Sequence, residues 1–210
     1  MSNILYIKTS PMGRLSHSIT VADAFVDSYL KVHPKDKVKT IDLFTEAIPA
    51  FDFKAASAKY NIMHNKVHSV EEQQIWDKIV TVIEEFKSAD KFVLAVPMWN
   101  FSIPYRLKQY IDIIVQPGYT FTVTEDGNYQ GLVTDKPIFI AYARGGEYPE
   151  GSPMQAFDLQ RKYLELILSF IGFTDIRSVI IEPTLMATPE VLEEKVDGAI
   201  AKAKQIAEEF

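Results

Sequence analysis

The hydrophobic positions of this chain alternate between short apolar runs and longer stripes in which apolar residues recur every three or four positions. Five runs rich in valine, isoleucine, leucine or aromatic residues predict β-strands: Ile4–Lys8, Val38–Leu43, Phe92–Pro97, Ile138–Ala143 and Arg177–Glu182. The first, third and fourth runs are continuously apolar, which is typical of strands that are covered on both faces.

An amphipathic helical stripe follows each run. The five stripes lie within residues 22–30, 75–86, 107–114, 163–170 and 192–207. Boundary signals agree with them: the capping box Ser69-Val70-Glu71-Glu72, the helix start Thr188-Pro189 and the helix end at Gly172. Strand–helix alternation repeated five times predicts an α/β fold with a parallel sheet and helices on both faces.

For five strands we expect the flavodoxin-like three-layer sandwich with strand order 2-1-3-4-5. No linker divides the chain, so residues 1–210 are predicted to form one domain. Residues 44–68 are too long for an ordinary connection and predict a functional excursion. Residues 116–134 combine a strand-like segment with an Asp126-Gly127 turn signal, which predicts a short projecting hairpin.

Composition narrows the classes of function. The chain has no cysteine, which excludes disulfides, thiolate nucleophiles and cysteine-ligated metals. A net charge of -6 argues against a nucleic-acid or anionic-membrane binder, because such proteins need a basic face. Neither a signal peptide nor an apolar stretch of membrane-spanning length is present, so we expect a cytoplasmic protein without membrane insertion.

Unusual residues follow the first predicted strand, at the edge where open α/β sheets bind ligands. Thr9, Ser10, Ser16 and Ser18 place hydroxyls at the start of a helix, and hydroxyls with free backbone N–H groups suit a phosphate ester. The alternative is that Ser16 or Ser18 is an ordinary helix cap. Neither a G-x-G-x-x-G dinucleotide pattern nor a phosphate-loop motif occurs in the chain.

The loops after the third and fourth predicted strands carry two further signals. Met98-Trp99-Asn100-Phe101 could wall a flat heteroaromatic ligand or form an apolar plug. Gly145-Gly146 could let a ligand approach the backbone closely or form a plain turn. Arg144 could carry charge to an anionic ring or pair with a carboxylate. Since the three loops fall in one predicted crevice, together they predict a flavin mononucleotide (FMN) site.

A family resemblance runs over essentially the whole chain. The stretch Pro97-Met98-Trp99-Asn100-Phe101-Ser102-Ile103-Pro104, followed by Leu107-Lys108-Gln109-Tyr110-Ile111-Asp112, resembles the FMN-dependent NADH-azoreductases, also described as FMN-dependent NADH:quinone oxidoreductases. Three further segments match: Ser10 with Ser16-His17-Ser18, Arg144-Gly145-Gly146 and Phe170-Ile171-Gly172-Phe173-Thr174-Asp175.

The resemblance implies a flavodoxin-like homodimer with an FMN site near the interface. By analogy, Ser10, Ser16, His17 and Ser18 hold the phosphate, and Met98, Trp99, Asn100 and Phe101 line the isoalloxazine. The pyrimidine edge of the flavin would lie along Ala143, Arg144, Gly145 and Gly146. The family commonly has serine where this chain has Ala143, so a hydroxyl contact is lost there.

The resemblance also implies an activity. NADH or NADPH would reduce the bound FMN, and a quinone or azo compound would then take two electrons by a ping-pong mechanism that needs no catalytic side chain. The alternatives are a flavodoxin-like electron-transfer protein that works with a separate reductase, and a fold-only protein that has lost its cofactor. The modest net charge and the two excursions favour the enzyme.

Other residues need their own interpretation. Ser16-His17 lacks the nucleophile elbow of a hydrolase. His64, His68 and Glu72 have a metal-like spacing, but the capping box at Ser69 interrupts that helix, so no metal is expected. The excursions are expected to roof the pocket, in their own subunit or in the partner. Candidates for stacking on an acceptor are Tyr60, Tyr119, Phe121 and Phe157.

Overall fold

The computed structural model describes residues 1–210 and centres on a parallel sheet. The strands of the sheet are β1 (Asn3–Lys8), β2 (Lys37–Asp42), β3 (Lys91–Pro97), β6 (Ile138–Ala143) and β7 (Ile176–Ile181). Each lies within one residue of its predicted bounds, which confirms the five-stranded parallel sheet.

The strand order is β2-β1-β3-β6-β7. It differs from the expected 2-1-3-4-5 because two hairpin strands, which do not belong to the sheet, lie between β3 and β6 in the sequence. The register places Tyr6 of β1 between Thr40 of β2 and Val93 of β3. Strand β1 is therefore an interior strand. The chain crosses from one side of β1 to the other between β2 and β3, which makes this the switch point of the sheet.

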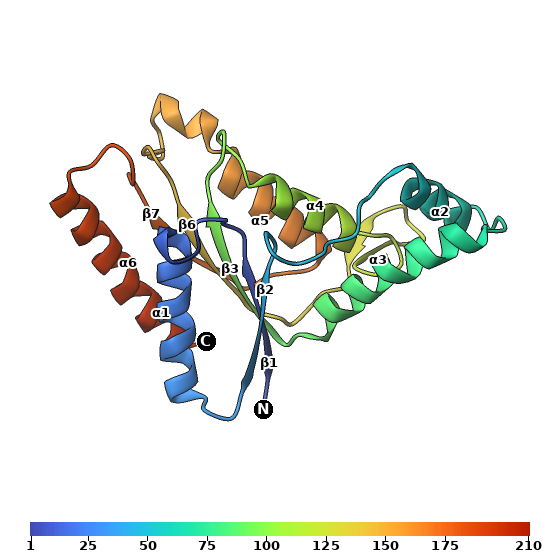
Figure 1. The fold of residues 1–210 in the computed structure, drawn as a ribbon, viewed down its shortest axis with the longest axis horizontal. Coiled ribbons are helices and arrows are strands. Elements are labelled where there is room, and N and C mark those ends of the chain that lie inside the picture. Colours follow the sequence, from blue (N-terminus) through green and yellow to red (C-terminus); the bar gives the residue numbers. More distant parts are fainter.

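Helices cover both faces of the sheet, as Figure 1 shows. Helices α1 (His17–Val32) and α6 (Pro189–Glu208) lie on one face, while α3 (Val70–Ser88), α4 (Tyr105–Ile114) and α5 (Leu159–Ile171) lie on the other. Successive strand residues point to opposite faces, so Ile4 and Tyr6 join the α1–α6 core and Leu5 and Ile7 join the other core. This two-sided burial explains the continuous apolar runs.

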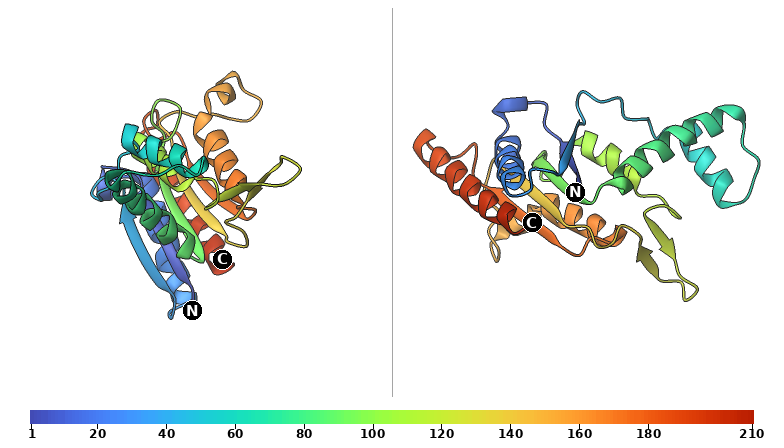
Figure 2. Two further views of the ribbon diagram at one scale, coloured as in Figure 1. Left: turned by 90° about the vertical axis from the view of Figure 1, so that its right-hand side faces the viewer. Right: turned by 90° about the horizontal axis from the view of Figure 1, so that it is seen from below.

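The excursion at residues 44–68 contains a helix that the hydrophobic pattern did not predict. Helix α2 (Phe53–Met63) packs along α3, and the two project away from the sheet (Figure 2). Only Ala55 and Ala58 of α2 are buried, so the helix lacks the apolar stripe that reveals the others. Its start is fixed by Asp52, whose side chain accepts a hydrogen bond from the Ala55 N–H at 3.1 Å.

The predicted hairpin is confirmed in residues 116–134. Strands β4 (Phe121–Val123) and β5 (Tyr129–Gly131) pair antiparallel and project from the body of the molecule (Figure 2). The hairpin is tied to the end of α5, because the Val133 N–H donates to the Ile171 carbonyl at 2.8 Å. No helix of the structure combines the length and the apolar character that crossing a bilayer requires.

Candidate functional site

Three loops converge at the carboxyl edge of the sheet, where β1, β3 and β6 are neighbours. Backbone hydrogen bonds fix their relative positions. The Thr9 N–H, just past β1, donates to Ala95 of β3 at 3.2 Å, and the Met98 N–H donates to Ala143 of β6 at 2.7 Å. The structure thus brings together the three segments that the sequence singled out.

The serine loop ends in a helix start without a side-chain cap. Ser16 occupies the N-cap position of α1, but its hydroxyl lies 3.0 Å from the Ser18 hydroxyl and does not cap the helix. By contrast, α2, α3, α5 and α6 each have a side-chain cap. The first N–H groups of α1 are therefore left for another acceptor, which favours the anion-site interpretation over an ordinary cap.

The remaining groups of this loop lie close by. Ser10 and Ser18 are buried, and the Ser10 hydroxyl accepts from the Met12 N–H at 3.3 Å. His17 is the first residue of α1 and is half-buried. A short 3₁₀ turn, Gly13–Leu15, leads into the helix start. The buried hydroxyls thus lie in the segment that ends at the positive end of the α1 dipole.

A tight turn follows β3 and holds the predicted aromatic segment. Trp99 and Ser102 exchange two backbone hydrogen bonds of 2.9 Å each. Between them Asn100 and Phe101 have φ of 48° and 67°, the two positive values of a type I′ turn. These conformations are costly for residues other than glycine, and such strain concentrates at binding sites. The turn leaves Asn100 exposed and Phe101 43% exposed.

Aromatic side chains gather on both sides of this turn. On one side Trp99 packs against Phe44, with ring centroids 5.7 Å apart. On the other side Phe101 packs against Phe157 at 5.1 Å and meets Tyr148 edge-on at 6.4 Å. The segment is therefore a partly exposed aromatic surface and not a closed plug.

The side chain of Arg144, which follows β6, pairs with two carboxylates. Its side chain is almost fully buried and lies 2.9 Å from Asp158 and 3.3 Å from Glu182. Its Nε donates to the side-chain oxygen of Gln160 at 3.0 Å, and the Gln160 amide donates to the Val96 carbonyl at 3.0 Å. Of the two alternatives for Arg144, the structure supports pairing, so its guanidinium is not free to contact a ligand.

The two glycines differ in their surroundings. A Cβ at Gly145 would lie 2.9 Å from the Leu185 Cδ1, closer than an ordinary contact allows, whereas the nearest atom to a Cβ at Gly146 would be the Tyr148 hydroxyl at 3.8 Å. Of the pair, the Gly146 backbone can therefore be approached closely. The contact with Leu185, in the loop after β7, was missed by the sequence reasoning. The available signal was an apolar pair, Leu185-Met186, directly after the last predicted strand.

Of the four candidate stacking residues, only Phe157 contacts an aromatic residue of the site in this chain. Tyr119 packs near Trp76, Phe121 packs on Phe170 and Tyr60 packs on His64. These three lie on the hairpin and the projecting helix, away from the serine loop (Figures 1 and 2).

Two members of the metal-like triad, His64 and Glu72, have other hydrogen-bond partners. The His64 ring contacts the Tyr60 carbonyl at 2.8 Å, and Glu72 both completes the capping box with Ser69 and accepts from the Ser57 hydroxyl at 2.5 Å. These hydrogen bonds hold the pKa of Glu72 below its ordinary value.

A cleft of about 820 Å³ opens beside the Trp99 side of the turn. Its walls include Phe51, Tyr105 and Gln109 from the excursion and α4, and Tyr163 from α5. The serine loop does not line it. The candidate site therefore has the serine loop at the start of α1, an exposed aromatic turn at its centre and a wide cleft of mixed polarity beyond.

A parallel sheet of this order, with the switch point between β1 and β3 and helices on both faces, defines a protein of the flavodoxin-like class. Residues 2–207 match the family described as flavodoxin-like fold, and the chain belongs to this family.

Named relatives resemble the chain over its full length. It is 50% identical over 210 residues to an FMN-dependent NADH:quinone oxidoreductase of Nitratidesulfovibrio vulgaris, with 100% of both chains covered. A crystal structure of an azoreductase from Bacillus anthracis str. Sterne superposes with a TM-score of 0.90 at 31% identity, again covering 100% of both chains. An FMN-dependent NADH-azoreductase from Bacillus anthracis str. Ames Ancestor in complex with FMN gives 0.87 at 28% identity, covering 99% of this chain and 100% of the other.

Proposed function

We propose that this protein is an FMN-dependent oxidoreductase that takes electrons from NADH and passes them to quinones and azo compounds. The observation that carries the proposal is the carboxyl edge of the sheet, where an uncapped helix start lies beside a strained aromatic turn and the Gly145-Gly146 pair. The names of the relatives reported above point to FMN as the cofactor, NADH as the donor, and quinones and azo compounds as the acceptors.

The serine loop fits the phosphate of FMN. Ser10, Ser16, His17 and Ser18 would surround it, with the free N–H groups of α1 as donors. The Ser16 and Ser18 hydroxyls already lie 3.0 Å apart and need only rotate to donate to phosphate oxygens. The positive end of the α1 dipole adds to this attraction.

The aromatic turn and the glycine pair fit the flavin ring. Met98, Trp99, Asn100 and Phe101 would line the isoalloxazine, because they form the partly exposed aromatic turn at the carboxyl end of β3. Along the pyrimidine edge, Ala143, Arg144, Gly145 and Gly146 would contribute backbone groups only. The Arg144 side chain is bound to Asp158 and Glu182, and Ala143 has no hydroxyl.

When bound, FMN supplies the two-electron hydride chemistry, so this chain needs no acid, base or nucleophile. Its residues bind and orient the ring, and the N–H groups of Gly145 and Gly146 would stabilise negative charge near the pyrimidine edge. Donor and acceptor would use the same exposed surface in turn, beside Phe101, in a ping-pong mechanism.

We also propose a homodimer, with residues 1–210 as one domain in each subunit. The cleft beside α4 is wide and the side chains of Phe101 and Tyr105 are 43% and 63% exposed, which supports a covered surface in the assembly. The excursions at 44–68 and 116–134 would roof the site of their own subunit or of the partner. A cytoplasmic location stays a prediction.

The test is to load the protein with FMN, mix it with NADH or NADPH without air, and follow flavin bleaching. The enzyme bleaches with NADH alone and regains its colour when a quinone or an azo dye is added. A flavodoxin-like carrier, the alternative, bleaches only when a separate reductase is present. Ser18→Ala and Asn100→Ala should each release FMN more readily during dialysis; full retention by both variants would show that the site is misplaced.

A further inference from the structure

The loop after β7 is anchored to the glycine segment by four hydrogen bonds or ion pairs. The Arg144 carbonyl accepts from the Thr184 N–H at 2.8 Å and from its hydroxyl at 3.0 Å. The Gly145 carbonyl accepts from the Leu185 N–H at 3.1 Å, and Glu182 pairs with the Arg144 guanidinium. The loop is therefore held in one place at the carboxyl edge of the sheet.

This anchored loop presents two large apolar side chains to solvent. Leu185 is 85% exposed and Met186 is 82% exposed. The Leu185 side chain lies directly over Gly145, so closely that a Cβ at that position would approach its Cδ1 to 2.9 Å. Exposed apolar side chains are common singly, but two adjacent ones on a loop anchored through Thr184 and Leu185 are typical of a binding surface.

A second apolar surface flanks the same glycine pair. Tyr148 is the nearest side chain to Gly146. Its ring meets Phe101 edge-on, and Phe101 packs against Phe157. Figure 1 shows the β7–α6 loop and the segment before α5 at the same end of the sheet. Leu185 thus lies beside Gly145, and the aromatic side chains lie beside Gly146.

We propose that Leu185 and Met186 form a specificity-determining wall for the electron acceptor. They contact the part of a flat apolar acceptor that extends past the reacting ring, so they favour acceptors with two or more rings over single-ring quinones. Leucine provides a fixed surface, and the flexible thioether of Met186 adapts to different ring shapes. This inference rests on the function proposed above, and it concerns binding and not the redox step.

Because the wall contacts a remote part of the acceptor, it contributes equally to ground-state and transition-state binding. Removing it should raise KM and leave kcat unchanged. In the Leu185→Ala/Met186→Ala double variant, KM for a two-ring azo dye should rise about tenfold, as expected for the loss of a few buried methylene contacts. KM for benzoquinone and the retention of FMN should stay within about twofold of the parent values.

The matched control is Leu166→Ala, the same truncation at a 70% exposed leucine on α5. It should leave KM for both acceptors unchanged. Three results would each refute the proposed role of Leu185 and Met186. They are a rise in KM of equal size for benzoquinone and the dye, no rise in KM for the dye, and the same rise in Leu166→Ala.

A binding measurement separates this inference from the proposed function. The azo dye is titrated into the oxidised, FMN-loaded protein without any NADH, and its Kd is read from the spectral shift of the dye. The double variant should bind about tenfold more weakly than the parent; equal Kd values would overturn the wall. Failure of the parent protein to reduce benzoquinone with NADH would instead refute the proposed function, and the dye titration would still decide on the wall.

Discussion

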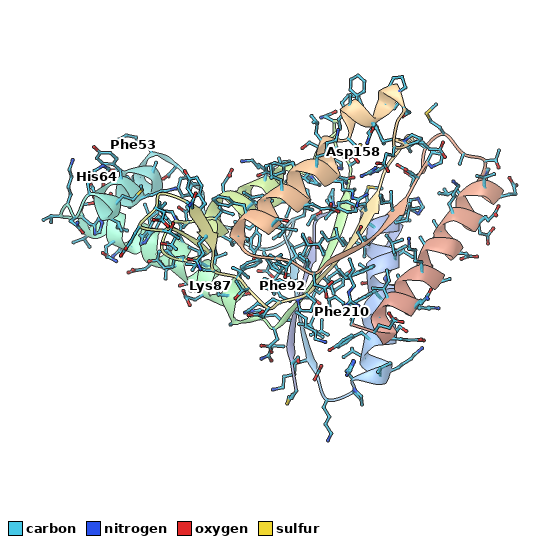
Figure 3. All side chains as sticks on the ribbon, turned by 180° about the vertical axis from the view of Figure 1, so that it is seen from behind. Phe53, His64, Lys87, Phe92, Asp158 and Phe210 are labelled. Atoms are coloured by element: carbon cyan, nitrogen blue, oxygen red, sulfur yellow. The ribbon has the colours of Figure 1, made fainter.

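The cluster around Arg144 allows a sharp prediction, because one buried cation there serves two carboxylates. Arg144 pairs with Asp158 at 2.9 Å and with Glu182 at 3.3 Å. Figure 3 shows Asp158 at the end of α5 nearest the carboxyl edge of the sheet. Removing the cation and removing one carboxylate should therefore lower the free energy of unfolding by different amounts.

Arg144→Met removes the cation and leaves the Asp158 and Glu182 carboxylates without the counter-charge that they share. Breaking a buried ion pair in this way costs about 3–5 kcal/mol. Asp158→Asn is milder, because Arg144 keeps Glu182 and Gln160. The single amide oxygen of asparagine can replace only one of the two acceptors that Asp158 offers, to Arg144 or to the Arg161 N–H at 3.0 Å. Losing one such charged hydrogen bond costs about 1.5–3 kcal/mol.

The assay is urea unfolding followed by tryptophan fluorescence, at one protein concentration and without FMN, so that ligand binding and mass action do not shift the midpoint. The free energy of unfolding should fall more in Arg144→Met than in Asp158→Asn. Thermal midpoints should follow, with a loss on the order of 10 °C in the arginine variant.

A cost of Arg144→Met below that of Asp158→Asn in urea unfolding would refute the ion-pair reasoning.

Two further predictions concern stability. Gly131→Ala should lower the free energy of unfolding in urea by about 1–3 kcal/mol, because a Cβ there runs into the backbone at Gly172. The control is Gly198→Ala in α6, where a Cβ meets nothing within 4 Å, so this change should stabilise the protein by about 0.5–1 kcal/mol. Equal effects of the two changes would contradict the tight contact between the hairpin and Gly172. Hydrogen bonds from the Ser2 N–H and from the Tyr29 hydroxyl lower the pKa of Asp36 below its ordinary value near 3.8. The stabilisation by the Asp36 carboxylate is therefore present above about pH 4 and is lost as the pH falls further. Asp36→Asn should destabilise the protein at neutral pH and not in strong acid, and a pH-independent effect in urea unfolding would count against this account.

Part of the site could be predicted because it depends on local sequence. The serine loop, the Met98–Phe101 segment and the glycine pair each follow a strand whose apolar run is unmistakable, and parallel strands bring their carboxyl ends to one edge. Their neighbourhood follows from chain order alone. What each side chain does there is a different question, since partners distant in the sequence decide it.

Arg144 illustrates the limit. Its sequence position allowed either a ligand contact or a carboxylate partner, and only the fold brings Asp158 and Glu182 within reach of its guanidinium. Helix α2 is a second example. Its buried face consists of two alanines that pack on α3, so almost no hydrophobic signal marks it.

The sequence by itself determined the parallel α/β sheet, the five helices with apolar stripes, the hairpin and the three loops that meet at the edge. These follow from periodicity, turn residues and capping, which are local properties of the chain. Only the tertiary structure decided that Ser16 leaves α1 uncapped, that Asn100 and Phe101 adopt positive φ, and that Leu185 lies against Gly145. Those features depend on contacts between segments far apart in the sequence, and no local pattern encodes such contacts.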